Sequence, residues 1–161
     1  MLIGRELIEA TLEKARQSPR RRMNYNFHAG PEDNPHRFLN VLLENTYVAP
    51  HRHLRPPKAE SFLVLEGRIA MFCFDDDGAV QSRHVLGYGN GAEALGIDLA
   101  PGVWHTLTAV TPYAVCYEVK PGPWDPATDK EFAPWAPREG EEGAPEYLRK
   151  LLQQAFIEPQ P

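Results

Sequence analysis

Three histidines and one glutamate have the residue types and the spacing of a metal site. His51 and His53 are separated by one residue in YVAPHRH, and Glu60 opens the apolar run SFLVLEG. Successive side chains of a strand point to opposite faces, so the two imidazoles point the same way. His105 follows the turn-forming Pro-Gly pair of PGVWH, ahead of another strand-like segment. Three imidazoles and a carboxylate form a mixed nitrogen and oxygen set that divalent transition metals accept.

The alternative is that these side chains are ordinary polar residues on a solvated sheet. Any one of the six histidines, taken alone, favours that interpretation. Their combination in one short chain favours metal binding, because imidazoles and carboxylates that lie together readily ligate metals. We therefore expect one divalent ion per chain, and the ligand set alone does not choose among Zn, Fe, Mn, Ni and Cu.

Two further residues are candidates for proton transfer near that ion. Lys58 lies in the loop LRPPKA just before Glu60, and His28 ends the segment MNYNFH. If that segment is a strand, Asn26 and His28 have the same parity and face the same side. The face is either a wall that binds a ligand or an exposed edge.

Three more residues are candidates for binding a substrate, together with Asn26. Asn34-Pro35 is typical of a helix start, which predicts a short helix from Pro35 to about Leu43 with Arg37 and Asn40 on one face. The alternative for both is an ordinary surface position. Trp104, next to His105, is either a stacking wall of the pocket or a buried structural residue.

The elements that must position these side chains are mostly strands. From Tyr47 to Lys120, short β-rich segments alternate with turn signals, a pattern that indicates an antiparallel sandwich or barrel. Residues 2–16 carry an apolar stripe typical of an amphipathic helix, which would pack on the domain or on a partner subunit. After Lys120 the chain is rich in Pro, Gly and charge, but Trp124, Phe132 and Trp135 predict that it wraps the sheets. A helix is expected over about 145–156.

Composition excludes several function classes. A net charge of −5 and a pI near 5.7 argue against general binding to nucleic acid or to anionic membranes. No stretch approaches the roughly 20 apolar residues of a membrane span, and the first residues lack the unbroken apolar segment of a signal peptide. Cys73 and Cys116 lie in apolar runs, as buried thiols do in a reducing compartment. We therefore expect a cytoplasmic protein that binds neither nucleic acid nor membrane.

The motifs around the histidines resemble those of the cupins, small β-barrels of jelly-roll type. His51-x-His53, Glu60 and Gly102-x-x-His105 resemble the two cupin metal-binding motifs, although the interval before Glu60 is longer than usual. Within that superfamily the chain is most similar to the WbuC-type cupin metalloproteins, from about residue 22 to residue 139. The segments that carry this likeness are LNVLLENTYVAPHRH, KAESFLVLEGRI, PGVWHTL, YEVKPGP and DKEFAPWAP.

The resemblance implies an all-β fold, a cupin-type jelly-roll β-barrel with an N-terminal helix and a C-terminal extension that ends in a helix. One domain would span residues 1–161, with the helix in 1–18, the barrel core in 22–122 and the wrapping extension in 123–161. His51, His53, Glu60 and His105 would hold the metal inside the barrel. A homodimer is consistent with this reading, because cupins often pair through barrel faces.

WbuC-type proteins are encoded among genes for O-antigen and other cell-surface polysaccharides, which implies a sugar or nucleotide-sugar ligand. One hypothesis is therefore a metalloenzyme, either isomerase-like or epimerase-like with a redox-silent ion, or oxygen-using with a redox-active one. The other is a non-catalytic module in which the metal braces the barrel or captures a ligand. An ionisable group beyond the ligands, within proton-transfer reach of the metal, would favour the enzyme.

Overall fold

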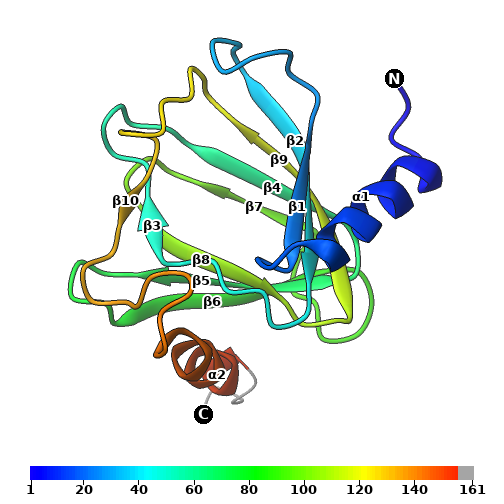
Figure 1. The fold of residues 1–161 in the computed structure, drawn as a ribbon. Coiled ribbons are helices and arrows are strands. Elements are labelled where there is room, and N and C mark those ends of the chain that lie inside the picture. The colour runs from blue at the N-terminus through cyan, green and yellow to red at the C-terminus, as the bar shows by residue number, and fades with distance from the viewer. Residues whose placement is uncertain (156–161) are drawn as a thin grey trace.

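The computed structural model describes residues 1–155, which form two helices and ten strands (Figure 1). Most of the strands are short and separated by turns, as the sequence pattern predicts. In chain order the elements are α1 (Arg5–Gln17), β1 (Arg22–Asn26), β2 (His36–Leu43), β3 (His51–Arg52), β4 (Glu60–Glu66), β5 (Arg68–Phe74), β6 (Val80–Gly87), β7 (Gly96–Leu99), β8 (Trp104–Ala109), β9 (Tyr113–Lys120), β10 (Glu131–Phe132) and α2 (Ala144–Ala155).

The strands form two five-stranded antiparallel sheets that face each other (Figure 1). The first sheet has the order β1-β2-β9-β4-β7, and the second has the order β10-β3-β8-β5-β6. This arrangement confirms the expected jelly-roll fold with flanking helices. Within the described residues the strand ladders stay inside each sheet, so the two sheets form a sandwich and not a closed barrel.

The core lies between the two inner faces. Alternate residues of each strand point inward, because side chains of a strand alternate between its faces. Val64 from the first sheet meets Met71 and Leu107 from the second, and all three are at most 3% exposed. This apolar layer fills one end of the sandwich, while the polar residues described below occupy the other part of the same inner faces.

The segment after Pro35 is a strand, so the predicted helix from Pro35 to about Leu43 is wrong. Strand β2 is apolar on both faces, since one side meets the core and the other is covered by α1. An apolar run that is buried on both sides reads equally well as a helix, and tertiary packing decides between them. The strand also separates Arg37 from Asn40, which have opposite parity and point to opposite faces.

Each helix covers the outside of one sheet. The stripe of α1 packs through Ile8, Leu12 and Ala15 against outward-facing residues of β2, including Leu39 and Val41. Helix α2 lies below β5 and β6 in Figure 1, where Leu151 joins the cluster that contains Phe72. The predicted N-terminal and C-terminal helices are thereby confirmed, and both pack on the sheets of their own chain.

The segment between β9 and α2 runs back over the second sheet. Its short strand β10 pairs with β3, with Glu131 opposite Arg52 and Phe132 opposite His51. Trp135 anchors it further along, with its ring 5.0 Å from that of Phe74. The extension is therefore fixed beside the strand that carries the first histidine of the predicted metal site.

The two cysteines, Cys73 and Cys116, are buried free thiols, as expected. Burial raises the pKa of the Cys116 thiol, which keeps it protonated. Among residues 1–155, no helix combines the length and the apolar character needed to cross a membrane.

Candidate metal centre

The two sheets bring the four predicted ligands together. His51 on β3 is the register partner of His105 on β8, and both belong to the second sheet. His53 follows β3 directly, and Glu60 opens β4 in the first sheet. All four side chains are buried, with 2–3% of each residue exposed. The cluster therefore spans the space between the sheets.

Each histidine is oriented by a main-chain carbonyl at its Nδ1 atom. His51 Nδ1 lies 3.0 Å from the carbonyl oxygen of Ala49, and His105 Nδ1 lies 2.9 Å from that of Val103. His53 Nδ1 contacts the carbonyl oxygen of Asp129 in the C-terminal extension. A carbonyl only accepts hydrogen bonds, so each Nδ1 carries the proton and each Nε2 presents a lone pair.

The atoms that remain converge on one point. One ligand atom from each of the four residues can be chosen so that all lie within 4.8 Å of one another. His53 Nε2 lies 3.1 Å from Glu60 Oε1, and His105 Nε2 lies 2.9 Å from Glu60 Oε2. Yet both Nε2 atoms and Glu60 Oε2 are buried without a hydrogen bond of regular geometry to any described residue. Buried polar atoms normally have partners, so this is the arrangement of a site that holds an ion.

The protonation states also suit a metal. Burial, with the nearby charge of Lys130, lowers the pKa of His51 well below its ordinary value, which keeps the imidazole neutral. Burial acts against ionisation of Glu60, but donation from His105 and His53, when these rings carry a proton on Nε2, and the charge of Lys120 hold the pKa of that carboxyl well below its usual range. Neutral imidazoles and an ionised carboxylate are the forms that ligate metals. The residues therefore fit one divalent ion.

The long interval between His53 and Glu60 is accommodated by a loop. The main-chain carbonyl of His53 accepts from the amide of Lys58 at 3.3 Å and from that of Gly102 at 3.1 Å. These bonds close the loop beside the turn that delivers His105. Residues 55–57 of this loop are exposed, and Glu60 still reaches the cluster.

A layer of buried charges surrounds the cluster. Asp129 accepts from Lys58 Nζ at 2.9 Å and from Lys120 Nζ at 3.0 Å, while Lys120 Nζ also lies 3.5 Å from Glu60 Oε1. All of these side chains are at most 6% exposed. One aspartate of the extension thus fixes His53 through its carbonyl and neutralises two lysines through its carboxylate.

A cavity of about 910 Å³ leads to the cluster, and His51 and Glu60 form part of its wall. Of the residues predicted to take part in chemistry, Asn26, His28 and Asn40 line this cavity. His28 stacks on His36 with ring centroids 4.0 Å apart, and both lie in the cavity wall. Asn26 ends β1 and His28 lies beyond it, so the two do not share a strand, although both line the cavity.

Three residues predicted for the site lie outside the cavity lining, namely Trp104, Arg37 and Lys58. Trp104 has the opposite strand parity to His105, so it points to the outside of the second sheet and donates to Asp76 at 2.9 Å. Arg37 is exposed and outside the cavity lining, because it has the parity of the outer face of β2. Each has the alternative position that the sequence left open, Trp104 as a buried structural residue and Arg37 on the surface.

Lys58, predicted as a candidate for proton transfer, has a structural place instead. Its ammonium is buried outside the cavity lining and already donates to Asp129 and, at 2.6 Å, to the carbonyl oxygen of Pro123. A lysine with these partners holds the loop in place. Its place in the structure is that of a support for the cluster.

Sequence reasoning missed several ionisable residues that face the cavity, among them Glu118, Lys120 and Lys130. The strand YAVCYEVK carried a usable signal, because Glu118 and Lys120 have the same parity as the buried Cys116. Lys130 lies in the Pro-rich extension, where no periodicity exists to reveal which side chains face inward.

Two of these groups are strongly perturbed. Burial raises the pKa of Glu118 to about 8, and the negative charge of Glu60 adds to this effect. Burial lowers the pKa of Lys130, and the charge of Lys120 lowers it further. Perturbed groups in a cavity beside a candidate metal centre are typical of functional sites.

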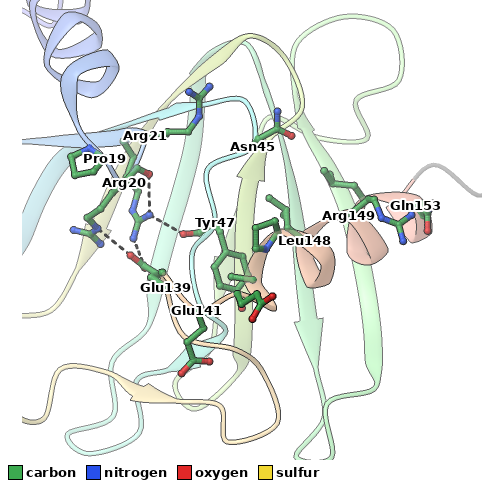
Figure 2. A pocket seen from close by; sticks show the side chains of 16 residues that line it. Pro19, Arg20, Arg21, Asn45, Tyr47, Glu139, Glu141, Leu148, Arg149 and Gln153 are labelled. Carbon is green, nitrogen blue, oxygen red and sulfur yellow. Dashed lines mark hydrogen bonds and ion pairs between the residues drawn. The ribbon is translucent and has the colours of Figure 1, made fainter.

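A second hollow, of about 1220 Å³, lies between α2 and the loop that precedes β1 (Figure 2). It is larger, but none of its lining residues is a histidine or a cysteine. Arg20 donates to Glu139 at 3.1 Å, and Arg22 contacts the same carboxylate. Two arginines of the Arg20-Arg21-Arg22 run are thus paired within the chain, and we place the chemistry in the other cavity.

Two sequence comparisons bear on this site. Residues 3–86, slightly more than half of the chain, match the family model described as a domain of unknown function, DUF6016. No curated protein matches the sequence.

Solved structures share the fold at low sequence identity. The capsular polysaccharide assembling protein CapF from Staphylococcus aureus is 19% identical, with a TM-score of 0.57 over 71% of this chain and 32% of that one. This chain therefore spans about a third of the CapF length. Protein SO0799 from Shewanella oneidensis is 10% identical, with a TM-score of 0.56 over 86% of this chain and 88% of that one. At these identities the likeness establishes the cupin-type fold alone.

Proposed function

Since this chain belongs to the DUF6016 family, a domain of unknown function, we propose its function from the site itself. The protein is a metal-dependent enzyme that acts on a small oxygenated molecule, a sugar or nucleotide-sugar. The reaction class is isomerisation or epimerisation, or oxygen chemistry if the resident ion is redox-active. The observation that carries the proposal is the buried cluster of three oriented imidazoles and Glu60 at the wall of a cavity.

The chain's own residues would divide the work as follows. His51, His53, Glu60 and His105 would hold the ion, and when bound it would supply a Lewis acid that polarises a ligand oxygen. Four protein ligands leave one or two positions of a five- or six-coordinate ion for that oxygen. The burial of the cluster excludes bulk water from one side of the ligand.

Ionisable groups in the cavity favour an enzyme over an inert module. Glu118 and Lys130 face the cavity and are not metal ligands, and both have perturbed pKa values. A carboxylic acid with a pKa near 8 can both hold and release a proton near neutral pH, as general acid–base catalysis requires. Their presence in the same cavity as the cluster supports the enzyme hypothesis.

The finer assignment is to surface-polysaccharide synthesis, including O-antigen, in a protein of the WbuC type. Its support is the resemblance of the HxH, Glu60 and GxxH segments to that group, and the fold shared with a capsular polysaccharide assembling protein. A cytoplasmic location and a homodimer are parts of the same proposal.

A second candidate function is a non-catalytic module braced by its metal. The observation in its favour is that the ligands come from both sheets, with Glu60 in the first and the histidines in or beside strands of the second. An ion at this place would tie the sheets together whether or not a reaction occurs. In that case metal removal would destabilise the fold, and no ligand would be turned over.

The test is a thermal-shift screen of metal-loaded protein against neutral sugars, sugar acids, nucleotide-sugars and unrelated metabolites. We expect stabilisation by members of the sugar classes and none by the same compounds in a His51→Ala/His105→Ala variant. If unrelated metabolites stabilised the protein while no sugar did, the assignment to sugars would be wrong.

A further inference from the structure

The cavity contains a polar pair, Asn40 and Glu118, that is not part of the metal cluster. The two side chains lie on neighbouring strands β2 and β9, and Asn40 Nδ2 donates to Glu118 Oε2 at 3.0 Å. Asn40 is 8% exposed and Glu118 is 6% exposed, and both line the cavity. Asn40 Oδ1 is buried without a partner among the described residues. Whichever way the amide is turned, one of its ends remains unpaired and available to a ligand.

The position of this pair relative to the metal cluster follows from the strand register. Glu118 is the register partner of Phe62, two residues along β4 from Glu60, and all three side chains face inward. A diagonal neighbour of this kind in a sheet lies roughly 7 Å away. A small ligand that reaches the ion could therefore touch Asn40 and Glu118 at the same time.

Among the residues that the structure describes, one cationic side chain of the cavity wall has no ion-pair partner. Lys58 and Lys120 share Asp129, and Arg20 and Arg22 share Glu139. Within residues 1–155 the ammonium group of Lys130, a half-buried residue, makes neither a hydrogen bond nor an ion pair. An unpaired amine in a cavity wall is a ready partner for an anionic group.

We propose that Asn40, Glu118 and Lys130 form a second recognition site in the cavity, which selects a hydroxylated organic anion. The Asn40–Glu118 pair binds a hydroxyl group, because a hydroxyl donates to the amide oxygen while it accepts from a carboxylic acid. Lys130 pairs with the anionic group, either a carboxylate or a phosphate. This inference deepens the proposed function and rests on it, since the ligand occupies the same cavity as the metal.

The protonation of Glu118 fits this role. Burial and the charge of Glu60 raise the pKa of Glu118 to about 8, so at neutral pH its side chain is an O–H donor. Lys120, Lys130 and the Asn40 amide act on it in the opposite direction. As pH rises through about 8, Glu118 ionises, loses its donor and repels a nearby anion. Affinity for the ligand should therefore fall over that range.

The experiment is isothermal titration of zinc-loaded protein with glucuronate, glucose 1-phosphate and glucose at low and high salt. We expect at least one of the two anions to bind at least tenfold more tightly than glucose, with a difference that shrinks as salt screens the Lys130 charge. The carboxylate and phosphate arms tell which anion the site takes. Equal affinity for glucose and both anions would overturn the proposal.

Matched variants assign the effect to residues. Lys130→Met should remove the advantage of the anion, while Lys14→Met, a substitution of an exposed lysine on α1, should leave it unchanged. Glu118→Leu should weaken glucose and the anions alike. Glu118→Gln, which preserves a neutral donor, should bind as wild type at pH 7 and keep its affinity at pH 9, where wild type declines.

The controls separate this inference from the function it rests on. Zinc content and circular dichroism are measured for every variant, and the conservative Glu118→Gln keeps the test valid if Glu118→Leu fails to fold. Wild type could prefer the anion while Lys130→Met and Glu118→Gln bind it with wild-type affinity at every pH. That result would refute only the assignment of the recognition site. If no sugar of any class binds zinc-loaded wild type, the proposed function falls as well.

Discussion

Each histidine of the cluster is oriented through the ring nitrogen that points away from the centre of the cluster. The carbonyl oxygens of Ala49, Val103 and Asp129 take the three Nδ1 protons, and this leaves the Nε2 atoms unprotonated. Such partners fix the ring as well as the tautomer, so the cluster is organised before any ion arrives. At the scale of single residues the structure therefore favours tight metal binding with little rearrangement.

This arrangement predicts how substitutions of the ligands affect metal content. His51→Ala, His53→Ala and His105→Ala should each reduce bound metal from about one ion per chain to a small fraction. Glu60→Gln should weaken binding at least tenfold, because a neutral amide replaces the anionic ligand. Metal analysis after dialysis measures both effects.

The matched controls for these variants lie outside the cluster. His84→Ala removes a half-exposed histidine that pairs with Glu93 at 2.9 Å, and it should retain the full metal content. Glu66→Gln changes the other end of β4, where Glu66 accepts from the Tyr113 hydroxyl at 2.9 Å. Stoichiometric metal in a His51→Ala/His105→Ala double variant would refute the site.

At the scale of elements, the C-terminal extension completes a site that the strands begin. Strand β10 pairs with β3, and just before it Asp129 provides both the carbonyl for His53 and the carboxylate for two buried lysines. Lys130 of the same segment supplies the free amine of the cavity. The two sheets without the extension would expose the cluster from this side and leave Lys58 and Lys120 without their shared partner.

Asp129→Ala tests the importance of this segment. It should lower the free energy of unfolding by about 3–5 kcal/mol, because it leaves the buried ammonium of Lys58 without an ion-pair partner and that of Lys120 with Glu60 alone. Urea denaturation followed by circular dichroism gives the change. Glu32→Ala, at an exposed position, should have no effect.

The effect of Asp129→Ala on the free energy of unfolding should not add to that of Lys58→Met. Adding Lys58→Met to Asp129→Ala removes the charge that has lost its ion-pair partner. The free energy of unfolding of the double variant should therefore fall by less than the sum of the two single changes. An Asp129→Ala protein that unfolds at the same urea concentration as wild type would show that this ion-pair layer contributes nothing to stability.

At the scale of the whole molecule, the cluster connects the two sheets of the sandwich. Glu60 belongs to the first sheet, while His51 and His105 belong to the second. Among residues 1–155 the strand ladders run only within each sheet, and the sheets are joined by side-chain packing and by an isolated bridge between Glu44 and Ala109. An ion bound to both sheets would stabilise their association directly.

Removal of the metal should therefore lower the stability of the whole fold. At a free-ion concentration about 1,000 times the dissociation constant, binding adds about 4 kcal/mol to the free energy of unfolding. For a chain of this size that is a fall of roughly 10 °C in Tm after treatment with a chelator. Differential scanning calorimetry before and after chelation measures it, and the His51→Ala/His105→Ala variant should show no such fall. An unchanged Tm in a wild type shown to bind metal would contradict a bracing role.

The sequence alone identified the four candidate metal ligands and the class of fold. The spacing His51-x-His53 places two side chains on one face of any extended segment. The turn before His105 and the start of the β4 segment at Glu60 can also be recognised from a few neighbouring residues. Strand alternation is likewise a local property, so an antiparallel β fold could be predicted from patterns a few residues long.

Only the tertiary structure decided which other side chains accompany the metal. The sequence pattern of segment 35–43 fits a helix or a strand, and the packing of α1 on its outer face decides for the strand. In that strand Arg37 and Asn40 point to opposite faces. Lys58 and Trp104 are close to ligands in sequence but are turned to other partners, whereas Glu118 and Lys130 are distant in sequence and face the cavity. The reason is physical: the ligand spacing is set within single strands, but the cavity wall is set by how two sheets and a returning segment pack.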